Sequence, residues 1–127
     1  MPFELFWEPR QLRVKFAGFM QDADFQHCAD MILGDERSDD VRTWIYDLSD
    51  VKGSDLTLDT LDLLTALALG ALTQVPGCVA VVTTDADLSQ AARLFCSRLA
   101  DLGPAEIFPS LADAQAWAEG AEAQTRF

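Results

Sequence analysis

The run CVAVVTT, residues 78–84, limits the fold more strongly than any other segment of the chain. Its residues are apolar or β-branched without alternation, so a strand formed here must be buried on both faces of its sheet. Strands of that kind lie in the centre of parallel sheets that helices cover on both sides. Pro76 and Gly77 stand directly before the run and end the helical pattern that precedes it.

Four further strands are expected from apolar and β-branched runs. FELFWEP forms a first short strand that ends at Pro9, and residues 11–18 alternate apolar with charged positions. Because only a short turn separates them, the two should pair as an antiparallel hairpin. Residues 43–48, TWIYDL, indicate a buried strand, and residues 105–108, AEIF, indicate a short one.

Helical periodicity fills the spaces between these strands. Apolar residues recur at helical spacing in segments 22–33, 58–72, 88–99 and 111–118. The order is therefore β-β-α-β-α-β-α-β-α, an α/β fold with a mostly parallel sheet and an antiparallel N-terminal hairpin strand. We expect one domain over residues 1–119 and a flexible tail over 120–127. The expected caps are Asp22 or Asp24, Gly34, Thr84 with Asp87, and Ser110 with Asp113.

The segment 58–72 is more apolar than one buried helix face requires. Its inner face comprises Leu61, Leu64, Ala68 and Leu72. A helix apolar around so much of its circumference favours a second contact surface, either a homodimer face or a groove for a small apolar molecule. The residues that widen the stripe into this surface are Leu58, Leu63, Leu67 and Leu69.

Charge and cysteine content exclude several classes of function. The formal net charge is −12, and the arginines are scattered, so nucleic acid is not an expected partner. Three cysteines without C-x-x-C spacing, Cys28, Cys78 and Cys96, indicate buried free thiols. The start MPFELFWEPR is not a signal peptide, and the richest apolar run, 61–72, is too short to span a membrane. We therefore expect a cytoplasmic protein.

Motifs for catalysis are missing from the sequence. No phosphate-binding glycine loop occurs, and the only histidine, His27, accompanies no G-x-S-x-G motif. Asp47, Asp50, Asp85 and Asp87 follow two strands and could together hold a hard cation such as Mg²⁺. Helix capping is the simpler interpretation of these acids. We expect no catalytic residue, no metal and no cofactor.

The polar segment YDLSDVKGSDLTLDT, residues 46–60, joins the buried strand to the leucine-rich helix. Its residues favour a turn in which Asp47 ends the strand, Gly53 permits a bend, and Asp55 or Thr57 begins the helix. A binding loop is the functional alternative, and its residues would be Asp47, Ser49, Asp50, Ser54, Asp55 and Thr57.

The stretch WIYDLSDVKGSDLTLDTLDLL resembles the central motif of STAS domains, the SpoIIAA-like (STAS/SEC14-type) family of bacteria. The strand VAVVTTD and the segment EIFPSLADAQAWA are similar to later parts of that family, and the resemblance covers residues 10–118. It implies a regulatory domain in which a serine after the central strand is phosphorylated, which blocks docking of a protein partner. The family's aspartate falls on Asp55 and its serine on Leu56, with Ser54 and Thr57 as the flanking phosphosite candidates.

Three hypotheses for function follow. The first is a non-catalytic module that binds a protein partner through residues 47–60 and the following helix, and that forms a homodimer. The second is a carrier or sensor of a small, lipid-like apolar ligand in a groove beside the 58–72 helix. The third, a metal-dependent enzyme that uses Asp47, Asp50 and Asp85, lacks any pairing of a nucleophile with a base.

Overall fold

A computed structural model describes residues 2–124 of the chain, with side chains described for residues 2–121. Five strands and four α-helices follow one another in the predicted order, with one short 3₁₀ helix inserted. Their bounds are β1 (Phe3–Glu8), β2 (Gln11–Met20), α1 (Asp22–Leu33), η1 (Glu36–Asp40), β3 (Thr43–Ser54), α2 (Leu58–Gln74), β4 (Cys78–Val82), α3 (Ala86–Leu99), β5 (Ala105–Phe108) and α4 (Leu111–Gln124).

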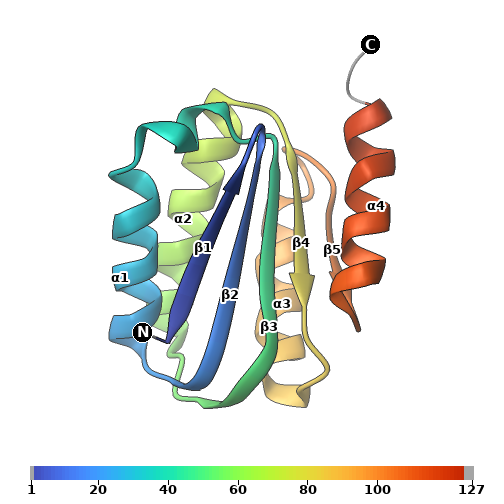
Figure 1. Ribbon diagram of the computed structural model, residues 1–127. Coiled ribbons are helices and arrows are strands. Elements are labelled where there is room, and N and C mark those ends of the chain that lie inside the picture. The colour runs from blue at the N-terminus through green and yellow to red at the C-terminus, as the bar shows by residue number, and fades with distance from the viewer. Residues whose placement is uncertain (1, 125–127) are drawn as a thin grey trace.

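The five strands form one sheet in the order β1-β2-β3-β4-β5 (Figure 1). β1 pairs antiparallel to β2, whereas β2, β3, β4 and β5 pair in parallel. β4 is buried at every position, as its uninterrupted apolar run predicted. The predicted α/β fold, with its parallel sheet and antiparallel first strand, is therefore confirmed.

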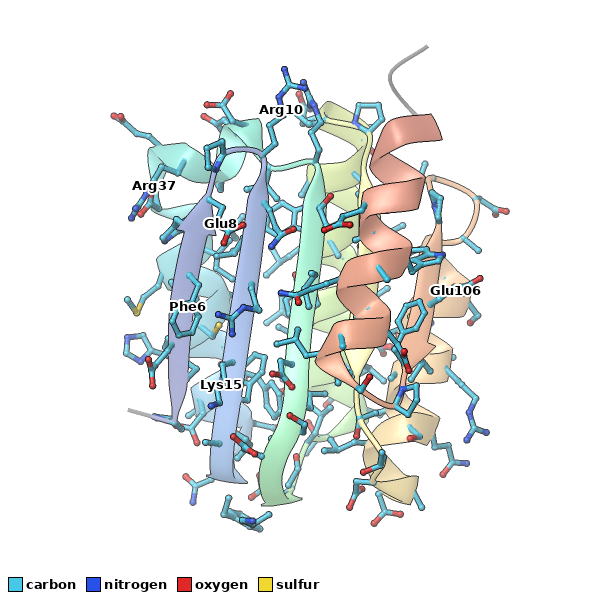
Figure 2. The ribbon with its side chains drawn as sticks, turned by 45° about the vertical axis from the view of Figure 1, so that its right-hand side comes forward. Phe6, Glu8, Arg10, Lys15, Arg37 and Glu106 are labelled. Carbon is cyan, nitrogen blue, oxygen red and sulfur yellow. The ribbon has the colours of Figure 1, made fainter. Side chains whose placement is uncertain are left out.

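The two faces of the sheet are covered unequally. α1, α2 and α3 lie over one face, and α4 alone lies over β3, β4 and β5 on the other face (Figure 1). α4 lies close against the sheet because small residues face it: Ala114 and Ala118 are buried against a cluster that contains Ile45. Beside α4, the same face of β1 and β2 is uncovered, and Phe6 and Lys15 lie on it (Figure 2). There the Arg13 guanidinium lies 4.0 Å from the centre of the Phe6 ring.

Several element bounds differ from the predictions. β3 continues to Ser54, six residues beyond the predicted end, and pairs with β2 across two register shifts. α4 continues to Gln124, so its last turns include the first residues of the predicted flexible tail. The remaining tail residues, 125–127, lie outside the described residues. Asp85, rather than Thr84, caps α3, because its carboxylate accepts from the Leu88 N–H at 3.0 Å.

Other expectations agree with the structure. All three cysteines are buried, and none of them forms a disulfide within the described residues. Burial raises the pKa of the Cys28 thiol to about 12, and burial, with a smaller contribution from Glu106, raises that of Cys96 to about 11. The Asp113 N–H donates to Ser110 Oγ at the start of α4, as predicted. No helix in the described part of the chain has the length and hydropathy to cross a membrane.

The loops that enter β3 and β4 approach each other very closely. The Cys78 N–H donates to the Arg42 carbonyl oxygen at 2.9 Å, which brings the backbone of Gly77 against the same residue. A Cβ atom on Gly77 would lie 2.3 Å from that carbonyl oxygen. Only glycine therefore fits between these loops without a shift of the backbone.

We expect Gly77→Ala to lower the free energy of unfolding by more than about 2 kcal/mol, because the new Cβ meets backbone that cannot move aside cheaply. Gly70→Ala is the matched control: Gly70 lies exposed within α2, and no atom would crowd its Cβ. That control should gain about 0.5–1 kcal/mol, since alanine is the better helix former. Urea unfolding of both variants measures the difference, and equal stability of the two would contradict the close approach.

Candidate functional site

One edge of the sheet collects the ends of β2, β3, β4 and β5 and the starts of all four α-helices (lower edge in Figure 1). In parallel α/β sheets, ligands usually bind beyond this edge, at the carboxyl ends of the strands. Most of the predicted loop residues lie near this edge, in the second half of β3 and in the short connection from β3 to α2.

The first part of the predicted loop is a bulged strand. Asp47 is buried, and its carboxylate accepts hydrogen bonds from the Ser49 N–H at 3.0 Å and from the Ser49 hydroxyl at 2.6 Å. This turn coincides with the first register shift between β2 and β3. Asp50 forms an exposed ion pair with Lys15 at 3.2 Å, which contributes little to stability.

Gly53 does not serve as the predicted bend. It lies within β3 opposite Phe19, and a Cβ there would lie 3.1 Å from the Phe19 ring. Its lack of a side chain therefore makes room for an aromatic ring on the neighbouring strand. β3 ends at Ser54, and Ser54 Oγ accepts from the Leu56 N–H at 3.1 Å. Leu56, which the sequence resemblance aligns with the serine of STAS domains, is half-buried and packs against the core.

A pair of hydrogen bonds joins the starts of α1 and α2. The Thr57 N–H donates to Asp22 Oδ1 at 2.8 Å, and the Thr57 hydroxyl donates to Asp22 Oδ2 at 2.6 Å. Thr57 also caps α2 as predicted, since its Oγ1 accepts from the Thr60 N–H at 3.2 Å. A third bond, from Gln26 Nε2 to Thr60 Oγ1 at 3.1 Å, links the same two helices. We call the Asp22–Thr57 pair the helix clasp.

The helix clasp was not predicted from the sequence. Asp22 was expected to cap its own helix, but Gln21 holds that position and its N–H donates to Asp24 Oδ2 at 2.9 Å. Hydrogen bonds from Thr57 to the charged carboxylate lower the pKa of Asp22 below its usual value. The two clasp residues are 35 positions apart, so no local pattern could have revealed the pairing.

The acids at this edge do not form a metal site. Within the described residues, no three His, Cys, Asp or Glu side chains lie close enough together to hold a metal ion. The structure therefore gives no support to the sharing of a cation by Asp47, Asp50 and Asp85. Acids instead occupy the helix starts, where they complement the helix dipoles: Asp22, Asp24, Asp59, Asp87 and Asp113.

Two large apolar side chains are exposed at the same edge. Leu58, at the start of α2, is 61% exposed, and Phe19, near the end of β2, is 58% exposed. These are the two highest values for large apolar side chains in the described part of the chain. We call the surrounding region the strand-end surface, and define it as Phe19, Lys52, Asp55, Thr57, Leu58 and Asp59.

The other predicted apolar residues of α2 are divided between solvent and core. Leu63 is exposed, whereas Leu67 and Leu69 are half-buried. Leu69 packs against the core, and Leu67 lines a crevice beneath the helix. The predicted apolar surface of Leu58, Leu63, Leu67 and Leu69 is thus not one continuous exposed stripe.

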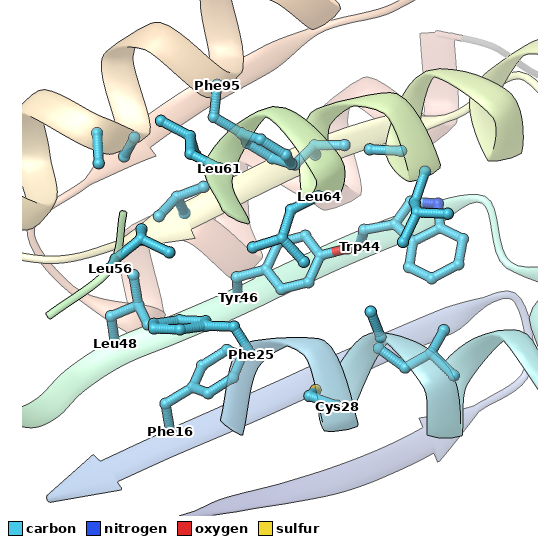
Figure 3. Close-up of a pocket in the computed structure, with 18 of the residues that line it drawn as sticks. Phe16, Phe25, Cys28, Trp44, Tyr46, Leu48, Leu56, Leu61, Leu64 and Phe95 are labelled. Carbon is cyan, nitrogen blue, oxygen red and sulfur yellow. The ribbon is translucent and has the colours of Figure 1, made fainter. Parts of the chain in front are cut away.

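An apolar crevice of about 140 Å³ lies between α2 and the sheet, with α1 and α3 as its side walls (Figure 3). Aromatic rings from three elements line the crevice: Phe25 on α1, Tyr46 on β3 and Phe95 on α3. The Tyr46 and Phe95 rings meet edge to face with centroids 6.2 Å apart. No charged side chain contributes to the lining.

Two of the residues that line the crevice, Trp44 and Tyr46, carry hydrogen-bond donors. Trp44 is only 7% exposed, and its indole N–H makes no hydrogen bond within the described part of the chain. The same holds for the Tyr46 hydroxyl, which extends from the same face of β3 toward α2 (Figure 3). Burial, with a smaller effect of Cys28, raises the pKa of Tyr46, so the phenol keeps its proton.

Comparison with solved structures identifies the fold. The chain is similar to SpoIIAA, an anti-sigma factor antagonist, in its unphosphorylated form, with a TM-score of 0.66, 13% identity, and coverage of 93% of this chain and 98% of that one. A proposed anti-sigma factor antagonist from Thermotoga maritima matches with a TM-score of 0.62, 12% identity and coverage of 92% and 94%.

A protein of SpoIIAA-like fold from Shewanella loihica matches with a TM-score of 0.58, 16% identity and coverage of 91% of each chain. No protein-family model and no curated protein sequence matches the chain. The likeness extends over more than nine-tenths of the chain, so the fold is SpoIIAA-like, as the sequence motifs indicated.

The helix clasp predicts a specific pH dependence of stability. Because the folded-state pKa of Asp22 is lowered, its charged form stabilises the fold above the unfolded-chain pKa of about 3.9, and this contribution disappears as the pH falls through the folded-state pKa. Asp22→Asn should therefore be less stable than wild type at pH 7, and the difference should shrink between pH 5 and pH 2.

Urea unfolding at each pH measures this difference. Asp55→Asn is the control, because the Asp55 side chain is exposed and makes no hydrogen bond or ion pair within the described residues. A constant difference between Asp22→Asn and wild type across this pH range would show that the clasp does not depend on the charge of Asp22.

Proposed function

We propose that this SpoIIAA-like domain is a non-catalytic regulatory module that binds a protein partner through the strand-end surface. The observation that carries the proposal is the exposure of Phe19 and Leu58 side chains at the edge where α/β domains usually bind their ligands. Exposed aromatic and aliphatic residues, surrounded by polar ones, are typical of protein contact sites.

The charges around these residues favour a particular kind of partner. Asp55 and Asp59 lie beside Leu58 in the chain, and Asp22 and Asp87 lie at the starts of neighbouring helices. Among the six residues of the strand-end surface, only Lys52 is basic. The partner should therefore present apolar side chains together with Lys or Arg, because complementary charge accelerates and directs association.

The same charges argue against self-association through this surface. Two copies that met here would bring carboxylates against carboxylates, which costs free energy. The homodimer expected from the leucine-rich helix would have to use another face, and it stays a prediction. Similarity to anti-sigma factor antagonists supports a regulatory protein contact in general, without naming a partner.

Phosphorylation of Ser54 or Thr57 also stays a prediction. The Thr57 hydroxyl is exposed, and a phosphate on it would stand next to the Asp22 carboxylate. Like-charge repulsion would then open the helix clasp and alter the strand-end surface. Ser54 is half-buried and its Oγ accepts from the Leu56 N–H, so a phosphate there has less room.

To test the docking surface, wild type, Phe19→Gln and Leu58→Gln serve as baits in extracts of the host cells. Leu102→Gln is the matched control, because Leu102 is an exposed leucine (39%) after the end of α3 and away from the strand-end surface. Partners that wild type and control retain, but the other two lose, are then purified, and their dissociation constants are measured by calorimetry.

We expect each strand-end substitution to weaken binding by at least about tenfold, as the loss of a central apolar contact does at protein interfaces. Raising the salt concentration should weaken the wild-type complex, because the attraction between opposite charges is screened. Equal affinity of all four proteins for every partner would refute this docking surface.

We propose as a second function that the domain holds a small apolar molecule in the crevice beneath α2. The supporting observation is the unfilled apolar space of about 140 Å³, which is unusual beneath a helix of a domain this small. An apolar cavity of about this size stays dry and admits a compact molecule such as benzene. The volume suits a compact molecule better than a long lipid chain, which narrows the class of lipid-like ligand expected from the sequence.

A small neutral hydrocarbon, methylenecyclohexane, should therefore raise the melting temperature, and the increase should grow with its concentration. Ala68→Leu fills the crevice from α2 and should abolish this increase. Ala66→Leu adds the same side chain on the exposed side of the same helix and should leave the increase unchanged. An increase that survives Ala68→Leu would show that the hydrocarbon binds elsewhere.

A further inference from the structure

We infer that the crevice beneath α2 takes a neutral, compact molecule that carries one hydrogen-bond acceptor, which receives a hydrogen bond from Trp44 or Tyr46. This inference rests on the second proposed function and names the chemical class of its ligand. A ketone, a lactone or an ester of about six to eight non-hydrogen atoms would fit the volume, given that an apolar cavity of similar size binds benzene.

The unpartnered donors point to the acceptor. The Trp44 side chain is more than nine-tenths buried, yet its indole N–H is without a partner in the described part of the chain. Every fully enclosed side-chain nitrogen or oxygen atom among the described residues has a hydrogen-bond partner, so the indole N–H must be accessible and can donate to a bound molecule. The Tyr46 hydroxyl, two residues along the same strand, offers a second donor to the same space. A ligand oxygen would satisfy a donor that the protein leaves free.

The surroundings select against a charged ligand. Apart from the Tyr46 hydroxyl, the Trp44 indole and the Cys28 thiol, the lining is hydrocarbon. The Cys28 pKa is raised by burial, so the thiol carries no charge at neutral pH. No Lys or Arg lines the crevice to compensate a carboxylate, and an uncompensated buried charge is expensive. The ligand should therefore be neutral, although its acceptor atom is polar.

Three cyclohexyl probes, the first two of one shape and the third larger by two non-hydrogen atoms, separate these requirements. Cyclohexanone has the acceptor, methylenecyclohexane replaces the ketone oxygen with CH₂, and cyclohexanecarboxylate adds a negative charge. Their dissociation constants are measured by NMR titration of the backbone amide and indole N–H signals of wild type, Tyr46→Phe, Trp44→Phe and Ala68→Leu. The two aromatic variants remove one donor each and keep an aromatic ring in place.

We expect cyclohexanone to bind wild type and to bind at least about tenfold more tightly than cyclohexanecarboxylate. The preference for the ketone is the ratio of the dissociation constants of methylenecyclohexane and cyclohexanone. In at least one of the variants Tyr46→Phe and Trp44→Phe, this ratio should fall by about three- to tenfold, which is the usual contribution of one hydrogen bond. Because the two dissociation constants are compared on the same variant, changes in packing or stability that affect both ligands alike cancel in their ratio.

The outcomes distinguish this inference from the proposed function beneath it. If methylenecyclohexane binds but neither aromatic variant changes the ratio, the crevice is an apolar site and the acceptor inference is wrong. Carboxylate binding as tight as ketone binding would likewise overturn it. If none of the three probes binds wild type at millimolar concentration, or if Ala68→Leu binds them unchanged, both the second function and this inference fail.

Discussion

Burial of β3 and β4 on both faces is the constraint on which the rest of the domain depends. These two strands carry the core residues Ile45, Ala80 and Val82 toward α4, and Trp44, Val79 and Val81 toward the three helices on the other face. Neither face could be left to water without exposing a continuous apolar surface. Helices must therefore cover both faces of the sheet. Because its strands run in parallel, the helices that follow them all start at the same edge.

The helices on the two faces of the sheet pack against it through side chains of different size. On one face, Ala114 and Ala118 let α4 approach the sheet closely. On the other, rings from β3, α1 and α3 line the apolar crevice beneath α2. Hydrogen bonds add to packing at the start of α2, through the pairs Thr57 to Asp22 and Gln26 to Thr60. The position of this helix is thus set by these bonds together with its buried side chains, among them Leu61 and Leu72.

Most of the fold could be predicted from sequence because each element carries a local signal. The unbroken run of residues 78–82, the alternation in residues 11–18 and the helical stripes are properties of adjacent residues. The second half of β3 could not be predicted. Two register shifts break the alternation of inward and outward side chains in this segment, and its Asp and Gly residues are unfavourable in strands. The sequence of the segment therefore predicts a turn. Pairing with β2 overrides that preference.

The candidate site was only partly predictable for the same reason. Thr57 as a helix cap follows from neighbouring residues, but its bond to Asp22 depends on how two helices meet in space. The family's serine position could be aligned, yet only the structure shows that Leu56 packs inward there. Similarly, the sequence predicts no more for Trp44 and Tyr46 than that they lie in a buried strand. Their free donors become evident only when the surrounding side chains are in place.

The unequal packing has a consequence for how this sequence can change over generations. Beneath α4, Ala114 and Ala118 are buried against the sheet, so a larger residue at either position would force the helix outward. Beneath α2, a space already exists to absorb added or altered side chains, so positions such as Leu64 and Ala71 can vary at smaller cost. The three-helix face is therefore where descendants of this chain are free to diverge, while the α4 face preserves the architecture.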